Sequence, residues 1–370
     1  MRIRTNGLFK KKNIYTIERY TFFLLILSMP FTDFLIEFPF ISHYLPRLFI
    51  LLGLGIILFE RIQYGIRFSK IEKILLMLMG ITFIWYIISN LHGFLFYPFF
   101  YPSHWDDFKE ILFLKKYFFD FFLENNILAT KIAAVFYFIR MSFFECLYTM
   151  GAAFFAIHLY QENPKSGFND FQKYIVILAV IIILYSLIEL PALMGSTLCK
   201  SILAFINYHT MSINHVGGGW PPVFWPMQVR SIFAEPSFFG LGFAVIFPIL
   251  LHWSTFYDKE KKWMYLRIVI VVMYVLLAFA TRSRTTTVLI LAETALFAFG
   301  FLWIRVLDFK KLLKIIIPVA LAFLLSLPLL STFSGTWYDR TTQEKSITSM
   351  ADTYVEDNIT SVINTAVYSF

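Results

Sequence analysis

The sequence has little charge and almost no cysteine. Only 15% of its 370 residues are Asp, Glu, Lys or Arg, whereas a soluble globular chain has about a quarter. The two cysteines, Cys146 and Cys199, have no second Cys or His at metal-ligand spacing, and their number excludes a disulfide-stapled secreted domain. Low charge, 58% hydrophobic residues and a mean hydropathy of +0.68 together exclude a soluble enzyme and a disordered protein.

The familiar nucleotide, nucleophile and metal motifs are also missing. No segment resembles a Walker loop, a Rossmann fingerprint, a Gly-x-Ser-x-Gly elbow or an EF-hand. The run 217–219 is three glycines, but a pair of prolines follows soon after it, which argues against a phosphate-binding loop. The sequence predicts no metal and no cofactor, because these histidines form no cluster with ligand spacing: His43, His92, His104, His158 and His252.

Long apolar runs separated by charged clusters are abundant, and this pattern is typical of a polytopic membrane protein. At about 20 apolar residues per crossing, the sequence predicts an all-α bundle of about nine transmembrane helices. Residues 1–330 form the predicted transmembrane domain, with extracytoplasmic loops at 90–131 and 195–230, and residues 331–370 form a polar extracytoplasmic segment. The predicted spans are 20–32, 46–59, 74–90, 132–159, 174–194, 232–253, 268–280, 286–304 and 312–330.

The positions of the basic residues predict the orientation of the chain. With a cytoplasmic N-terminus, the predicted cytoplasmic segments carry most of the 32 Lys and Arg residues, as the positive-inside rule requires. The net charge of +8 therefore reflects membrane topology, so we expect the lipid bilayer as a partner and no nucleic acid.

Four arginines lie where a membrane protein usually avoids them. Arg230 immediately precedes the sixth span, Arg282 and Arg284 precede the eighth, and Arg140 lies inside the fourth. These three spans all run inward from the outside, so their N-termini, with free N–H groups and partial positive charge, share the outer face. Guanidinium groups beside helix N-termini predict an outward-facing site for a phosphate-like anion.

Each of these features also has an ordinary alternative. Arg230 can pair with Glu235, and Arg140 with Glu145, or the arginines can extend to lipid headgroups. Glu235 is a candidate general base, because partial burial raises carboxyl basicity, or else a helix cap. His215, in the outer loop, is a second candidate base or a solvated loop residue.

Four further residues carry expectations about local structure. Pro236 suits the first turn of the sixth span, where its missing N–H is harmless, and Ser283 is a candidate cap for the eighth. Glu189 and Glu293 are carboxylates within spans. Because there are so few of them, an interhelical hydrogen bond is favoured over a proton relay for each.

The segment Arg230–Gly240, RSIFAEPSFFG, resembles a recurring motif of bacterial Wzy-type polysaccharide polymerases and O-antigen ligases, in which an arginine precedes a Phe-x-Glu-Pro-Ser/Asn-x-x-Gly-like helix start. The pair Ser283-Arg284 resembles their second signature. The resemblance implies a GT-C-type glycosyltransferase of the bacterial cytoplasmic membrane that uses neither nucleotide sugar nor metal. It also implies that Arg230 and Arg284 bind the diphosphate of an undecaprenyl-diphosphate-linked oligosaccharide, with a chain-length regulator and a flippase as partners.

Three functions remain open at this point. A polymerase joins lipid-linked repeats into O-antigen, capsule or exopolysaccharide, a ligase transfers finished glycan to lipid A core, and a flippase moves lipid-linked repeats across the membrane. Residues 331–370 lack the histidine base that the ligases place there, and no half-repeat of a transporter is visible, so the sequence favours the polymerase. Family members have further spans after this segment, and the chain is therefore expected to be truncated.

Overall fold

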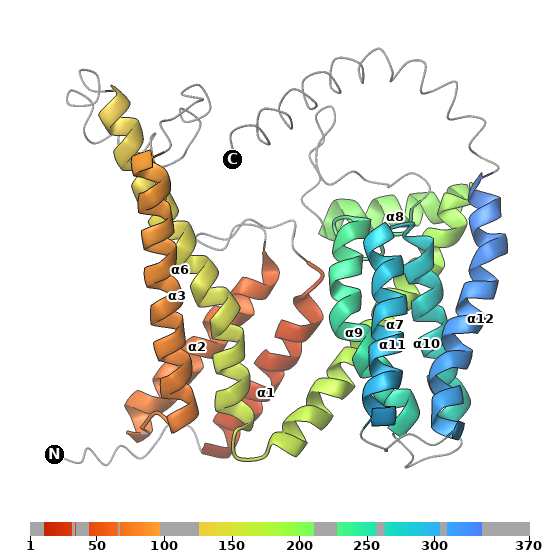
Figure 1. Ribbon diagram of the computed structural model, residues 1–370, viewed down its shortest axis with the longest axis horizontal. Helices are drawn as coiled ribbons and strands as arrows, with labels where there is room; N and C mark the ends of the chain where they lie inside the picture. The colour runs from red at the N-terminus through yellow and green to blue at the C-terminus, as the bar shows by residue number, and fades with distance from the viewer. Residues whose placement is uncertain are drawn as a thin grey trace. The chain divides into compact units, whose positions relative to one another are not determined.

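The computed structural model describes residues 11–31, 34, 44–65, 67–96, 126–210, 228–256, 263–303 and 309–334. The elements of this part of the chain are helices, labelled in Figure 1. They cluster into two compact units, which divide the region that the sequence predicts as one transmembrane domain. Unit 1 comprises residues 1–29 and 38–174, and unit 2 comprises residues 30–37 and 175–370.

The described part of unit 1 comprises four helices and the beginning of a fifth. These are α1 (Lys11–Ser28), α2 (Leu45–Tyr64), α3 (Lys70–Phe96), α6 (Asn126–Tyr160) and the first third of α7 (Pro164–Leu193). Helix α6 packs against α1, α2 and α3, and α2 also packs against α1. At the centre, the fully buried ring of Phe155 meets Phe22 edge to face, with ring centroids 5.8 Å apart.

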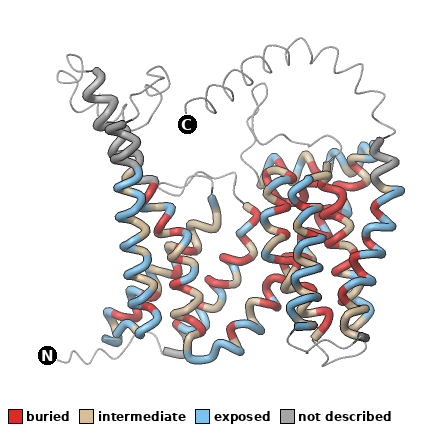
Figure 2. The backbone as a smooth tube through the Cα atoms, in the orientation of Figure 1, coloured by how far each residue is buried: buried red, intermediate tan, exposed pale blue. Residues whose placement is uncertain are grey.

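Unit 2 is organised around α9. It contains the rest of α7, α8 (Thr197–Thr210), α9 (Pro236–Phe256), α10 (Met264–Ala280), α11 (Arg284–Trp303) and α12 (Phe309–Ser334). Helix α9 contacts α10, α11 and α12. The buried ring of Tyr274 on α10 stacks on Phe239 and Phe243 of α9, with centroids 5.6 and 5.5 Å apart. These aromatic rings form the middle of the unit 2 core, and Figure 2 shows buried and exposed sides alternating along its helices.

Several helices suit a lipid environment. Large apolar side chains such as Leu296, Phe299 and Trp303 on α11 are exposed, which in water would leave an unfavourable apolar surface. Helix α10 is apolar but shorter than the usual span. Five stretches are long and apolar enough to cross a membrane, which indicates a multi-pass membrane protein: Lys70–Ser89, Ser142–Tyr160, Pro164–Leu193, Pro236–Phe256 and Lys311–Leu329.

The all-helical prediction is confirmed for the described residues, and each predicted span overlaps a helix. Nine crossings remain a prediction, because five helices meet the length and hydropathy of a span. The sixth span begins at Pro236 rather than at residue 232, because residues 231–235 form a non-helical turn that starts with Ser231 in a left-handed conformation.

The two predicted outer loops are shorter than expected. Because α3 continues to Phe96 and α6 begins at Asn126, helix occupies both ends of the predicted loop 90–131. Within the predicted loop 195–230, residues 197–210 form α8, which hydropathy alone misses because the helix is short and partly polar. Residues 97–125, 211–227 and 335–370 lie outside the described residues.

Two glycines of α2 provide a matched test of the packing in unit 1. A Cβ at Gly53 would lie 2.5 Å from the Phe155 ring, whereas a Cβ at Gly55 would meet no described atom within 4 Å. We expect Gly53→Ala to lower the free energy of unfolding by about 1–3 kcal/mol through overpacking. Gly55→Ala, on the same helix, should be neutral or raise it by up to about 1 kcal/mol. Unfolding titrations in detergent measure both, and equal effects would contradict this packing.

Candidate functional site

The two segments that carry the unusual arginines lie side by side in unit 2. The backbone N–H of Val229 donates to the carbonyl of Ala280 at 3.1 Å, which joins the residue before Arg230 to the end of α10. Helices α9 and α11 also approach closely near their starts, because a Cβ at Gly240 would lie only 2.6 Å from the Thr286 hydroxyl oxygen. The N-termini of α9 and α11 are therefore neighbours.

A carboxylate of α7 holds the segment before α9. The two oxygens of Glu189 accept the backbone N–H groups of Arg230 at 3.1 Å and Ser231 at 2.8 Å. The Ser231 hydroxyl donates to the carbonyl of Ile182 at 3.0 Å, which adds a second link to α7. The sequence predicts an interhelical hydrogen bond for Glu189, but its described partners are backbone N–H groups of the non-helical segment before α9.

Arg230 is buried rather than turned outward. Its exposed fraction is 1%, and its Nη1 donates to the carbonyl of Ala234 at 3.2 Å. The guanidinium also interacts with the hydroxyl of Tyr185, which donates to Asn207 of α8 at 2.5 Å. The Glu189 carboxylate also attracts the Arg230 guanidinium electrostatically, and this attraction offsets part of the cost of burying a cation.

The second arginine segment presents its charge differently. Arg284 is exposed at the first position of α11, and Arg282 is half-buried. Ser283 caps α11 as predicted, because its hydroxyl accepts the N–H of Thr286 at 3.4 Å and its carbonyl accepts the N–H of Thr287 at 3.1 Å. Arg284 thus places an exposed positive charge beside a helix N-terminus.

Two carboxylates named in the sequence predictions, Glu235 and Glu145, have partners of their own in the structure. Pro236 begins α9 as predicted, and the half-buried Glu235 before it accepts the Ser237 hydroxyl through its carboxylate. Glu145 pairs with Arg47 at 2.6 Å, so the alternative partner proposed for Arg140 is engaged elsewhere.

Two candidate site residues, Arg140 and His215, lie partly or wholly outside the described residues. Residue Arg140 lies on α6, but its side chain is outside the described set, and His215 lies outside the described residues entirely. For Glu293, Oε2 is buried without a hydrogen-bond partner among the described residues, so the predicted interhelical hydrogen bond is not seen for that oxygen.

Backbone strain is concentrated in the same two segments. Among the described residues other than glycine, positive φ angles occur at Ser231 (56°) and Arg282 (53°). Such conformations cost about 1–3 kcal/mol each and persist where the surroundings enforce them. Ser231 directly follows Arg230, and Arg282 is itself one of the four unusual arginines, so the protein maintains a costly backbone geometry where the anion site is predicted.

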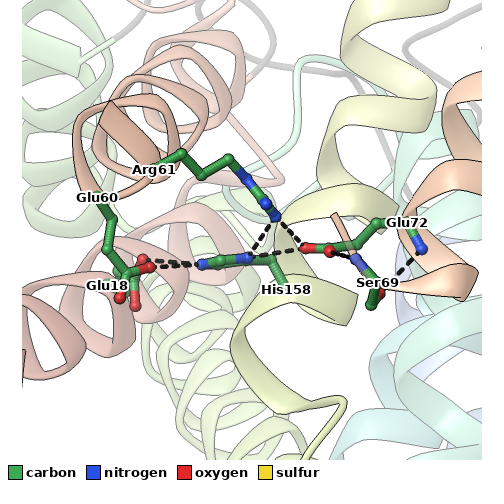
Figure 3. Close-up of polar contacts among 6 residues, drawn as sticks. All are labelled: Glu18, Glu60, Arg61, Ser69, Glu72 and His158. Carbon is green, nitrogen blue, oxygen red and sulfur yellow. Dashed lines mark hydrogen bonds and ion pairs between the residues drawn. The ribbon is translucent and has the colours of Figure 1, made fainter. Parts of the chain in front are cut away.

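Unit 1 contains a second charged cluster, which the sequence does not predict. Glu18, Glu60, Arg61, Glu72 and His158 converge from α1, α2, α3 and α6 (Figure 3). Spacing gives no sign of this cluster, because its members are up to 140 residues apart in the sequence. The available signal was topological: each of them lies near a span end that the predicted orientation assigns to the cytoplasmic face.

The role of Glu189 can be tested by a matched pair of substitutions in unit 2. Glu189→Ala would leave two buried N–H groups without an acceptor and the Arg230 charge without its partner. We expect a loss of about 3–5 kcal/mol in the free energy of unfolding. Glu293→Ala removes a carboxylate whose Oε2 has no described partner, so it should cost much less. Unfolding in detergent measures both, and a smaller loss for Glu189→Ala than for Glu293→Ala would contradict this role.

The geometry of unit 2 joins two helix N-termini, an exposed arginine and a strained backbone, and such an arrangement can bind an anion through backbone N–H groups and a guanidinium fork. No protein-family model, curated protein or solved structure matches this chain.

Proposed function

We propose that this protein polymerises undecaprenyl-diphosphate-linked oligosaccharide repeats into a surface polysaccharide on the outer face of the bacterial cytoplasmic membrane. The multi-pass helical fold supports the proposal, as does the resemblance of Arg230–Gly240 and Ser283-Arg284 to the two polymerase signatures. The observation that carries it is the 3.1 Å hydrogen bond from Val229 to Ala280, because it brings the two signature segments together.

The proposed reaction is a glycosyl transfer from a lipid carrier. An acceptor hydroxyl attacks the anomeric carbon of the lipid-linked glycan and loses its proton to a base. The bond from that carbon to the diphosphate oxygen breaks, and its electron pair leaves with the diphosphate. Because negative charge grows on the leaving group, donors fixed around it stabilise the transition state more than the ground state.

The structure favours different roles for the two signature arginines. Arg284 is exposed beside the N-terminus of α11, so we assign it direct contact with the diphosphate. Arg230 is buried and bonded to the carbonyl of Ala234, so in the described state it positions the segment that leads into α9. Arg282, half-buried and next to the cap of α11, is the second candidate for direct contact.

The candidate base is Glu235, with His215 as the alternative. Glu235 directly follows Ala234, the residue that Arg230 holds, and directly precedes α9. Arg230 therefore fixes the backbone that carries this carboxylate. Exposed apolar residues of α11, among them Val288 and Leu291, give the prenyl chain an apolar surface that begins next to Arg284.

Substitution of Arg284 tests the proposal most directly, because an exposed side chain can be removed without disturbing the core. In a strain that lacks this protein, we expect the Arg284→Ala variant to restore polysaccharide about 100- to 1,000-fold less well than the unmodified protein does. Arg284→Lys should rescue only part of this loss, since lysine lacks the bidentate fork. The measurement is polysaccharide yield and chain length at matched membrane levels of each variant.

The control is Arg67→Ala, which removes another exposed arginine, in unit 1, at the face predicted to be cytoplasmic. It should leave chain length unchanged. Undiminished chain length with Arg284→Ala would reject the assigned contact.

Arg230→Ala should lower polymerisation by a similar factor. Measuring how much of the variant protein is present in the membrane then separates a loss of positioning from a loss of folding.

The deletion strain itself distinguishes the three functions that the sequence leaves open. Loss of a polymerase leaves single repeats on the lipid carrier at the outer face. Loss of a ligase leaves long polymer on the carrier, and loss of a flippase leaves untranslocated repeats on the cytoplasmic leaflet. We expect the first result, and either of the others would overturn the proposed function.

A further inference from the structure

The charged cluster of unit 1 centres on the imidazole of His158, near the end of α6 (Figure 3). Its Nε2 lies 3.0 Å from Oε2 of Glu60 on α2 and 3.5 Å from Oε1 of Glu18 on α1. Its Nδ1 lies 2.9 Å from Oε1 of Glu72 on α3. One ring nitrogen therefore faces a single carboxylate, while the other faces two.

The carboxylate on the Nδ1 side is firmly held. The Glu72 carboxylate accepts hydrogen bonds from Nη2 of Arg61 at 2.5 Å and from the backbone N–H of Ser69 at 2.6 Å. The backbone N–H of Glu72 donates a hydrogen bond to the Ser69 hydroxyl at 3.2 Å. Nη2 of Arg61 also lies 3.3 Å from Nδ1, but the shorter contact, 2.9 Å, is to the fixed carboxylate of Glu72. Glu72 therefore favours the proton of a neutral imidazole on Nδ1 and orients the ring. The lone pair of Nε2 then points toward Glu18 and Glu60, which is the arrangement found behind metal-binding histidines.

Charge in the cluster does not balance. With a neutral imidazole, the three glutamates and Arg61 leave two negative charges, and the side chains are almost completely buried. Glu18 is 3% exposed, and its Oε1 has no hydrogen-bond partner among the described residues. A buried carboxylate oxygen without a hydrogen bond is costly, and a bound cation would offset that cost.

We propose that Glu18, Glu60 and Nε2 of His158 bind a divalent transition-metal ion of the Zn²⁺ or Mn²⁺ class. Their ligand atoms lie within 4.8 Å of one another. Bonds of 2.0–2.2 Å in a tetrahedral site separate ligands by about 3.3–3.6 Å, so small side-chain shifts complete the site. Imidazole nitrogen and carboxylate oxygen together suit these ions, and two positive charges neutralise the cluster.

The ion would act as a structural clip. It would tie α1, α2 and α6 together directly, and α3 through the bond from Glu72 to the histidine. This site is in unit 1 and is independent of the glycosyl-transfer proposal for unit 2. A ligand that binds the folded state stabilises it by mass action, so occupancy should raise the unfolding temperature.

Metal binding by the full-length protein in detergent tests the inference. After removal of metals with a chelator, dialysis against Zn²⁺ or Mn²⁺ should restore one tightly bound ion per chain and raise the unfolding temperature. Glu72→Gln should weaken the affinity for the ion by about 10- to 100-fold, as outer-sphere substitutions do. Glu18→Gln should weaken it at least as strongly.

Glu18→Gln should also leave the fold intact, because Oε1 of Glu18 accepts no hydrogen bond from the described residues. Its matched control is Glu145→Gln on α6, which neutralises an exposed glutamate outside the cluster and should bind metal like the unmodified chain. Absence of a tightly bound ion in the unmodified protein would overturn the inference. So would equal affinity and equal thermal stabilisation in Glu18→Gln, since both would place the ion elsewhere.

Discussion

The bond from the Glu189 carboxylate to two consecutive backbone N–H groups sets the architecture of unit 2. Those N–H groups belong to Arg230 and Ser231, which have no helix to satisfy them. In an apolar interior, unpaired N–H groups are costly, so the carboxylate determines where the chain turns before α9. Its attraction for the Arg230 guanidinium adds to the hydrogen bond from that group to the carbonyl of Ala234. One side chain of α7 thereby positions both the backbone and the charge of the first signature segment.

The bonded charged residues described above gather mainly where helix ends meet, because there opposite charges and free backbone groups can satisfy one another. Glu145 of α6 and Glu293 of α11 are exceptions, since they lie well inside their helices. In unit 2 the end of α7 meets the start of α9, and in unit 1 the ends of α2 and α6 meet the start of α3. The meeting of these ends agrees with the alternating topology inferred from sequence.

Local signals in the sequence predicted local structure well. Pro236 marked the start of α9, and Ser283 marked the cap of α11, because both act within one helical turn. Burial of Arg230 was not predictable in this way, since its partner Glu189 is 41 residues away. The role of His158 was missed for the same reason, because its partners lie on three other helices. Contacts that depend on which helix ends meet need the fold itself.

The close approach of α9 and α11 has a consequence for how this sequence can vary. Gly240 leaves just enough space for the hydroxyl of Thr286, so the two positions share one small volume. A larger side chain at either position would increase the distance between α9 and α11 and separate the two arginine segments. A smaller side chain at the other position would compensate for this change. Substitutions at these two positions are therefore coupled during evolution. In related sequences that keep the two segments together, we expect the side-chain volumes at positions 240 and 286 to covary.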